Sequence, residues 1–586
     1  MKKIFIYFLF LILLTYSAFA CLAPPNPEVY DVSGADHISL KDKTKRAPKI
    51  PVPRMPRYTI KSPQYVASSG SAMPLVILIE FDGTTHSATH DRAYMNNLVF
   101  DGHTRPSDSK TISVKNYFNE ISGGKLVIEN PSVGSNPTAW LTSAHTMSYY
   151  GADTNTSEGL IDDANGAISE LAREAVQLLD DGIFDFSKFD LDGDKIIDRV
   201  IVVHAGQGQE ASINSNTIWS HHWEISGGEE VKDEYTVKEY SIVSEYSPLG
   251  IFVHEFAHGF RSPDALTGAG IPDLYNTSSG ESAVGTWCLM DSGSWLDSGW
   301  NPAHLSAWCK CFLEWGTMTT LTESNLNALL YPTSEADNSS ATNEFYKIPI
   351  LNSDDEYFLL EYRRKTGGTN IYDTALKAEG LLIWHIDNSV LDETITYDDY
   401  GTQSRLFYNE INTDDSHKGI DVVEADNSES SGNEDGDIFG LSVTQFVHPQ
   451  SSSHSGNNSG ISIVNIAGPS ANYMSMDIYV IKATENQRIA KSYNYPNPAS
   501  ASTNIKIKLT KYLSKGKLSI FNIAGEMVFE TDVNNSNLTS SSDYEWIYEV
   551  TWDCDNNEGM NAASGVYIYI FNADDLKAFG KIIVLR

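Results

Sequence analysis

The stretch VHEFAHGFRSPD, from Val253 to Asp264, constrains this chain more than any other part of its sequence. His254 and His258 are four residues apart, so a helix would place both on one face, one turn apart. Ser247 and Pro248 are typical of a helix start, because proline at an early helical position gives up no hydrogen bond. The sequence therefore predicts a helix that begins near Ser247 and carries both histidines.

The residues around this helix indicate a mixed α/β domain. The apolar runs MPLVILIEF (Met73 to Phe81) and DRVIVVHAG (Asp198 to Gly206) are typical of buried strands. Between them, apolar residues from Ile168 to Leu179 recur at helical spacing, which predicts an amphipathic helix. Strands followed by packed helices predict an α/β domain over residues 71–318.

Beyond this domain the pattern changes to short strands separated by polar turns. The chain has 586 residues, too many for one core. EYFLLEYRR and GLLIWHID are strand-like, and residues 319–482 are expected to form an all-β sandwich. His385 and His454 fall in this module and are expected to be structural. Residues 483–586 alternate in the same way after a polar linker, which predicts a small, separate β-sandwich.

The first seventy residues are typical of an exported protein. Residues 1–20 combine two lysines, an apolar run and an Ala-Phe-Ala site, as a signal peptide does. Cys21 would then be the first mature residue, although the residues before it fit a lipoprotein signal poorly. Residues 21–70 include a basic, proline-rich stretch, interpreted as a pro-segment or a linker. The formal net charge of −36 argues against nucleic acid or an anionic membrane as a partner.

The residue types in the opening stretch suit peptide hydrolysis with zinc. Imidazole nitrogens of His254 and His258 could hold a zinc ion together, and a catalytic site leaves one position for water. Glu255 could accept the proton of that water and pass it to the leaving amine. Asp264 follows at a distance that suits a third ligand, after Pro263 ends the helix. An ordinary core helix with incidental histidines is the alternative.

The same residues resemble the immune-inhibitor-A-like secreted metalloproteases, a metzincin-like family that carries H-E-x-x-H-x-x-G-x-x-D. His254, Glu255, His258 and Asp264 match its positions, and Met290 in WCLMDSGSW resembles its turn methionine. Further blocks, SVKNYFNEISGGKLVI, VVHAGQGQEAS, GLLIWHID and HKGIDVVEAD, extend the resemblance over about residues 73–479.

Two departures from the family pattern leave the third zinc ligand open. Arg261 stands where the family has glycine, and the family's PDLYD is split between SPD and IPDLYN. Asp273 therefore competes with Asp264 for the third position, with Glu281 as a weaker option. Spacing favours Asp264.

A second cation site is expected in DLDGDKIID. Asp190, Asp192, Asp194 and Asp198 could turn their oxygens towards one calcium ion, and Gly193 allows the tight turn. The loop is not an EF-hand, because Lys195 stands at the sixth position. A solvated acidic turn is the alternative, although four uncompensated carboxylates would repel one another.

The end of the chain resembles a type A sorting domain of the type IX secretion system. YNYPNPAS, LSIFNIAGEMV and GKIIVLR carry this resemblance, and they also resemble an immunoglobulin-like fold. The resemblance implies the secretion machinery as a partner and a secreted or cell-surface location. With protein or peptide substrates, no nucleic acid and no transmembrane segment, the sequence predicts a secreted zinc endopeptidase. The alternative is a non-enzymatic, calcium-braced adhesin on a decayed protease fold.

Overall fold

The structure is a computed structural model, and it separates the chain into two compact units, residues 1–480 and 481–586. The predicted signal peptide and most of the predicted pro-segment lie outside the described residues. Described are residues 21–24 and 68–586, except 132–135, 157–158, 163–167, 213, 232–233, 262–269, 333–343, 366–369, 398–400, 428–433, 471, 482–490, 510–512, 514, 542–545 and 574–575.

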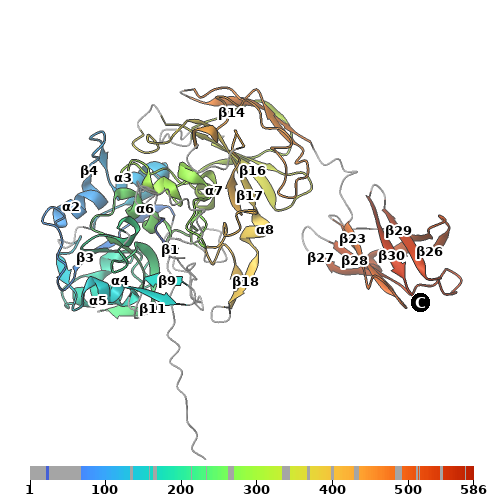
Figure 1. The fold of residues 1–586 in the computed structure, drawn as a ribbon, viewed down its shortest axis with the longest axis horizontal. Helices are drawn as coiled ribbons and strands as arrows, with labels where there is room; N and C mark the ends of the chain where they lie inside the picture. The colour runs from blue at the N-terminus through green and yellow to red at the C-terminus, as the bar shows by residue number, and fades with distance from the viewer. Residues whose placement is uncertain are drawn as a thin grey trace, which may run out of the picture. The chain divides into compact units, whose positions relative to one another are not determined.

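A six-stranded mixed sheet forms the centre of the first unit (Figure 1). Its strand order is β1-β11-β12-β10-β3-β7. β7, β3, β10 and β12 are parallel, whereas β11 runs antiparallel to β12 and β1 antiparallel to β11. The strands are β1 (Cys21–Leu22), β3 (Leu75–Glu80), β7 (Trp140–Thr142), β10 (Val200–His204), β11 (His221–Val231) and β12 (Tyr235–Ser244).

Helices cover both faces of this sheet because its central strands are apolar on both sides. Along β3, Val76 and Leu78 pack with α3 (Val114–Ile121) and α6 (Leu249–Ala257). The alternate residues Leu75, Ile77 and Ile79 pack with α5 (Ile168–Leu179) on the other face. This alternation follows from the two-residue repeat of a strand. The helix predicted from Ile168 to Leu179 is present with those bounds. The remaining helices of this part are α2 (Arg92–Asn96), α4 (Met147–Gly151) and α7 (Ala307–Phe312).

Residues 318–480 form two further sheets that share a core, as expected of a sandwich. The five-stranded sheet packs one face on the three-stranded sheet and the other on the core of the α/β part. The α/β part and the sandwich are therefore one compact unit. The larger sheet has the order β13 (Met318–Thr320), β15 (Phe345–Pro349), β16 (Glu356–Arg363), β17 (Gly380–Asp387) and β20 (Ile420–Val422); the smaller has β14 (Asn325–Leu330), β22 (Met474–Val480) and β21 (Ile461–Val464).

The second unit is a sandwich of two four-stranded antiparallel sheets around one apolar core. One sheet has the order β23 (Lys491–Tyr495), β24 (Thr503–Leu509), β28 (Trp546–Trp552) and β27 (Leu538–Ser541). The other has β26 (Met527–Val533), β25 (Gly516–Asn522), β29 (Gly565–Ala573) and β30 (Leu576–Val584).

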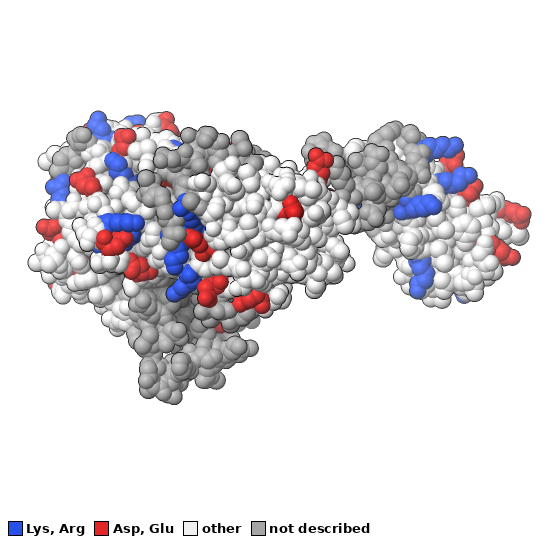
Figure 2. Space-filling model, turned by 90° about the horizontal axis from the view of Figure 1, so that it is seen from above, with Lys and Arg blue, Asp and Glu red and all other residues white. Residues whose placement is uncertain are grey.

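Two observations bear on the expected partners. On the face drawn in Figure 2, basic and acidic side chains lie interspersed in small groups, without a wide basic patch. Within the described residues, no helix is long and apolar enough to cross a membrane.

Candidate metal centre

Helix α6 presents the two histidines of the opening stretch to the same point. His254 lies in its last turn and His258 caps its C-terminal end, and both side chains are fully buried. The next residue is Gly259, and a larger residue would not fit because the side chain of Arg199 fills the space beside it. A Cβ atom there would lie 1.3 Å from Nη1 of Arg199, whose guanidinium packs over Phe256 and Phe260.

Backbone carbonyls fix the orientation of both imidazole rings. Nδ1 of His254 lies 2.9 Å from the carbonyl oxygen of Leu289, and Nδ1 of His258 lies 2.8 Å from that of Ile271. A carbonyl only accepts hydrogen bonds, so each neutral ring carries its proton on Nδ1. The two Nε2 atoms, 3.2 Å apart, then face each other as bare lone pairs. A metal ion between them would use both lone pairs.

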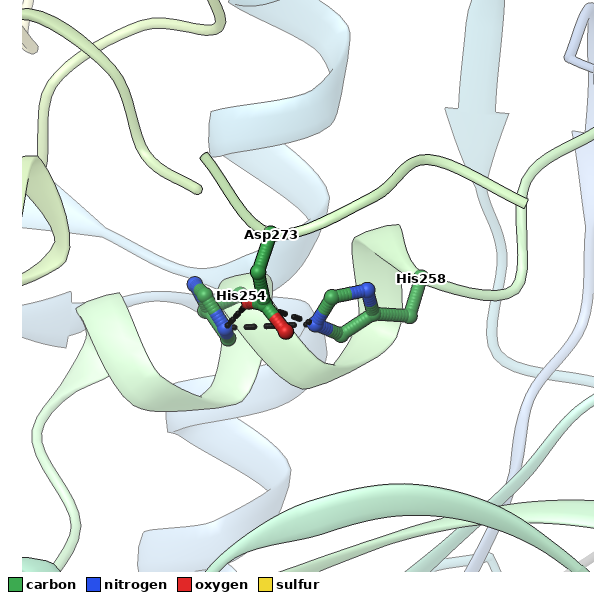
Figure 3. A group of neighbouring side chains, drawn as sticks. All are labelled: His254, His258 and Asp273. Carbon is green, nitrogen blue, oxygen red and sulfur yellow. Dashed lines mark hydrogen bonds and ion pairs between the residues drawn. The ribbon is translucent and has the colours of Figure 1, made fainter. Parts of the chain in front are cut away.

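Asp273 completes the group (Figure 3). Its Oδ1 atom lies 3.1 Å from Nε2 of His254 and 3.3 Å from Nε2 of His258. Four ligands at zinc–nitrogen and zinc–oxygen bond lengths are about 3.3–3.4 Å apart in a tetrahedron. The three atoms therefore have nearly the spacing of three corners around one zinc ion. Oδ1 of Asp273 is buried and makes no hydrogen bond, which also suits a ligand atom.

The sequence offered two other candidates for the third ligand, Asp264 and Glu281. Asp264 falls in residues 262–269, outside the described part of the chain. Glu281 is half-buried and pairs across a bridge with Asn276, and it is not part of the group at the histidines. Among the described residues, the carboxylate that meets His254 and His258 is that of Asp273, from the IPDLYN segment.

Glu255 lies beside this group with a free carboxylate. Both of its oxygens are buried without a hydrogen-bond partner, and Oε1 lies 4.0 Å from Nε2 of His254. Burial, together with the charges of Asp273 and Glu210, raises the pKa of Glu255 well above its usual value. This carboxylate therefore lies next to the candidate metal group with both oxygens available.

Residues that the sequence alone did not reveal hold Asp273 in place. Asn409, 136 residues further along the chain, donates from Nδ2 to Oδ2 of Asp273 at 2.6 Å. The Oδ1 atom of Asn409 accepts the backbone N–H of Asp273, also at 2.6 Å. The expected turn at Met290 contributes as well, because its carbonyl accepts the N–H of Leu274 at 2.8 Å. The turn thus supports both sides of the group, since Leu289 also holds His254.

Arg261 has a structural role at the end of α6. Its guanidinium donates to the carbonyl of His258 at 3.1 Å and pairs with Glu239 at 2.9 Å. Burial would raise the pKa of Glu239, but Arg261 and His222 hold it at about 2. The ring of His222 stacks on that of His258, with the two centroids 6.3 Å apart. Arginine in place of the family's glycine thus stabilises the helix end.

The acidic loop before β10 brings three of its four aspartates together. Ligand oxygens of Asp190, Asp192 and Asp194 lie within 4.8 Å of one another. Asp198 is outside this group, and its Oδ2 accepts the N–H of Leu191 at 3.0 Å. Burial, and then the charges of the other three aspartates, raises the pKa of Asp198 to about 7.

The residues after the predicted signal peptide lie along the edge of the main sheet, beside the metal group. Cys21 pairs with His222 and Leu22 with His221 in the antiparallel pairing of β1 and β11. The indole groups of two tryptophans bind the backbone of the next two residues, Ala23 and Pro24. Nε1 of Trp219 donates to the carbonyl of Ala23 at 2.7 Å, and Nε1 of Trp295 to that of Pro24 at 2.8 Å.

Comparison with known proteins assigns the part of the chain that carries this group. Residues 76–318 match the family described as immune inhibitor A peptidase M6, catalytic domain. This stretch is an M6 peptidase domain. The curated protein Immune inhibitor A of Bacillus thuringiensis subsp. alesti is 28% identical over 235 residues, which cover 35% of this chain and 32% of that protein. The chain thus matches about a third of that relative's length. M6 metallopeptidases are zinc-dependent, and the donor set described above fits zinc.

Residues 494–547 match the secretion system C-terminal sorting domain, so the expected sorting domain is confirmed. Together with the M6 domain, it points to a secreted or cell-surface protein.

Two solved structures show distant similarity. Dimeric latent PorU of Porphyromonas gingivalis is 13% identical, with a TM-score of 0.17 and coverage of 45% of this chain and 20% of that one. PorZ of the same organism, a surface component of its type IX secretion system, is 13% identical, with a TM-score of 0.13 and coverage of 41% and 38%. At these TM-scores the similarity carries no argument about fold.

Proposed function

We propose that this protein is a secreted zinc endopeptidase in which His254, His258 and Asp273 hold the metal and Glu255 is the general base. The observation that carries the proposal is the convergence of three buried ligand atoms, 3.1–3.3 Å apart, beside a carboxylate with two free oxygens. The M6 assignment of residues 76–318 supports it independently.

Each side chain has a defined part in peptide hydrolysis. A zinc ion held there would polarise the scissile carbonyl and acidify a bound water. Glu255 accepts the proton of the attacking water at a free carboxylate oxygen and passes it to the nitrogen of the leaving amine. His254 and His258 keep their Nε2 lone pairs for the metal, because Nδ1 of each ring is committed to a carbonyl. Asn409 leaves Oδ1 of Asp273 as the free ligand atom.

Two features of the sequence favoured the alternative of a non-enzymatic adhesin, and both have another explanation. It rested on Arg261 in place of glycine and on the split PDLYD segment. Arg261 donates to the carbonyl of His258, so it supports the helix end that a ligand needs. Asp273, from the second half of the split segment, lies at the two histidines.

The test is the replacement Glu255→Gln, which keeps the size of the side chain but removes the proton acceptor. We expect casein hydrolysis by the processed protein to fall by ~10²–10⁴-fold, while bound zinc stays near the wild-type amount. Activity close to wild type in this variant, or wild-type activity that survives a zinc chelator, would contradict the proposal. His145→Ala, at an exposed position in the same domain, serves as the control.

Two further assignments belong to this proposal. We infer that Asp190, Asp192, Asp194 and Asp198 hold a calcium ion, which offsets their mutual repulsion and braces β10. Residues 21–70 act as a pro-segment. This agrees with the position of Cys21–Leu22 on the sheet edge, which blocks that edge to an extended substrate. A chain that begins at Ser68 should therefore cleave a short peptide with a lower KM than the longer chain does, and an unchanged KM would argue against the pro-segment.

The expected division of the chain is retained in the proposal: a signal peptide at 1–20, a catalytic domain at 71–318, a β-sandwich at 319–482 and a sorting domain at 483–586. The secretion machinery would recognise the last of these, and the substrates would be proteins or peptides.

A further inference from the structure

Residues of the β-sandwich part gather three histidines and two carboxylates from four separate segments. His385 and Asp387 come from the end of β17, Glu356 from the start of β16, and His417 and His454 from two loops. The rings of His385 and His454 are stacked with centroids 4.1 Å apart, and those of His417 and His454 are 4.4 Å apart. Three imidazoles in contact are unusual in a structure that needs only apolar packing.

We propose that Asp387, His417 and His454 form a second binding site for a divalent transition-metal ion, separate from the centre on α6. One ligand atom from each of the three residues lies within 4.8 Å of the others. Two imidazole nitrogens and one carboxylate oxygen form a donor set that zinc and similar ions accept, whereas calcium prefers oxygen ligands alone.

The carboxylate of Asp387 is prepared for this role. Its Oδ1 atom caps α8 (Asn388–Leu391) by accepting the N–H and the hydroxyl of Ser389, at 2.9 Å and 2.6 Å. Its Oδ2 atom faces Nε2 of His417 at 2.8 Å. Without a metal this contact is a hydrogen bond. A metal ion would replace the shared proton, because the half-exposed ring of His417 can carry its proton on Nδ1 instead.

His454 offers an atom that no other described residue uses. Its Nε2 nitrogen is buried without a hydrogen-bond partner. Glu356 fixes the surroundings: one carboxylate oxygen lies 3.0 Å from Nε2 of His385 and accepts the N–H of His454 at 2.8 Å. An oriented imidazole with a free nitrogen is what a metal site requires.

An ion at this site would also restrain the loop that supports the centre on α6. His417 and Asn409 lie in one loop, and Asn409 holds Asp273. The same loop contacts the Asp273 segment again through Asp415, whose carboxylate accepts from Asn276 at 2.7 Å. This consequence rests on the proposed zinc centre, whereas the second site itself does not.

The experiment counts zinc on the full chain in a Glu255→Gln background, which prevents self-cleavage. After dialysis against zinc, we expect about two ions per chain. Replacing His417 and His454 by alanine should leave about one, as should replacing His254 and His258 by alanine. His145→Ala is the control and should leave both ions in place.

Thermal unfolding provides the second measurement. In the chain without His254 and His258, zinc should raise the midpoint, and removal of His417 and His454 should abolish that increase. With a chelator present, both chains should melt alike, which would show that the replacements do not damage the fold. Cobalt(II) bound to the same chain should give visible absorption bands of a nitrogen- and oxygen-coordinated ion.

The outcomes separate the two sites. If the chain without His254 and His258 binds no zinc, the second site does not exist. If the chain without His417 and His454 still binds two ions, the ligands are wrong. If that chain binds none while the chain without His254 and His258 binds one, the second site stands and the proposed zinc centre fails.

Discussion

Asn409 offers the sharpest test of how the β-sandwich part supports the candidate metal centre. Its amide makes two hydrogen bonds to Asp273, both 2.6 Å long, and both residues are buried. The replacement Asn409→Ala leaves Oδ2 of Asp273 without its donor and the backbone N–H of Asp273 without its acceptor. The aspartate is then free to turn away from the two histidines.

The expected loss follows from the charge on Asp273. A hydrogen bond to a charged group contributes ~1.5–3 kcal/mol. Zinc affinity should fall by about 10–100-fold, the usual effect of losing a residue that orients a ligand. That loss is equivalent to about 1.4–2.8 kcal/mol, in agreement with the value for the hydrogen bond. The assay is competition for zinc between the protein and a chromophoric chelator.

Asn276→Ala is the matched control for this test. Asn276 joins the same two segments through Asp415 at 2.7 Å but does not touch Asp273. We expect less than about a threefold change in affinity, because the ligand keeps its own hydrogen bonds. If Asn276→Ala weakens zinc binding as much as Asn409→Ala does, the effect comes from loosening the segment. If Asn409→Ala leaves the affinity unchanged, Asp273 does not depend on this support.

Three other predictions follow from the same structure. Gly259→Ala should destabilise the first unit by ~1–3 kcal/mol, because the new Cβ overlaps Arg199. Gly565→Ala should change stability little, because no atom lies closer than 3.9 Å to its new Cβ. Equal unfolding midpoints for the two variants would refute this prediction. Calcium should raise the unfolding midpoint more at pH 7.5 than at pH 5. The pKa of Asp198 is raised to about 7 in the folded chain, so without calcium the stability of the fold decreases as the pH rises from about 4 to 7. An equal increase of the unfolding midpoint at both pH values would argue against calcium binding at the loop. A chain that ends at Val480 should keep its peptidase activity but fail to leave the cell, since the following residues form a separate unit, and an inactive, folded protein would contradict this.

Local features of the sequence were enough to predict the elements that carry the histidines. Residues four apart on a helix lie on one face whatever surrounds them, so His254 and His258 could be paired without a structure. Apolar runs in β3 and β10 and the helical repeat in α5 are local in the same sense, because burial on two faces or one stripe dictates the residue types. The C-terminal sandwich was also predicted from a local pattern, the alternation of apolar residues along its strands.

The third ligand was a different problem because no local rule determines it. Asp264 and Asp273 differ by nine residues of loop, and loop length changes the closure entropy by less than about 1 kcal/mol. Asp273 lies at the histidines because Asn409 binds its carboxylate and the carbonyl of Met290 accepts the N–H of the neighbouring Leu274, and both partners come from other segments of the chain. The same holds for His417, which begins the HKGIDVVEAD block but meets Asp387 and His454 only after two loops and a strand end come together. Helical spacing depends only on residues within one turn and can be predicted from the sequence. The meeting of distant segments depends on the packing of the whole unit, so only the tertiary structure decides which residues meet.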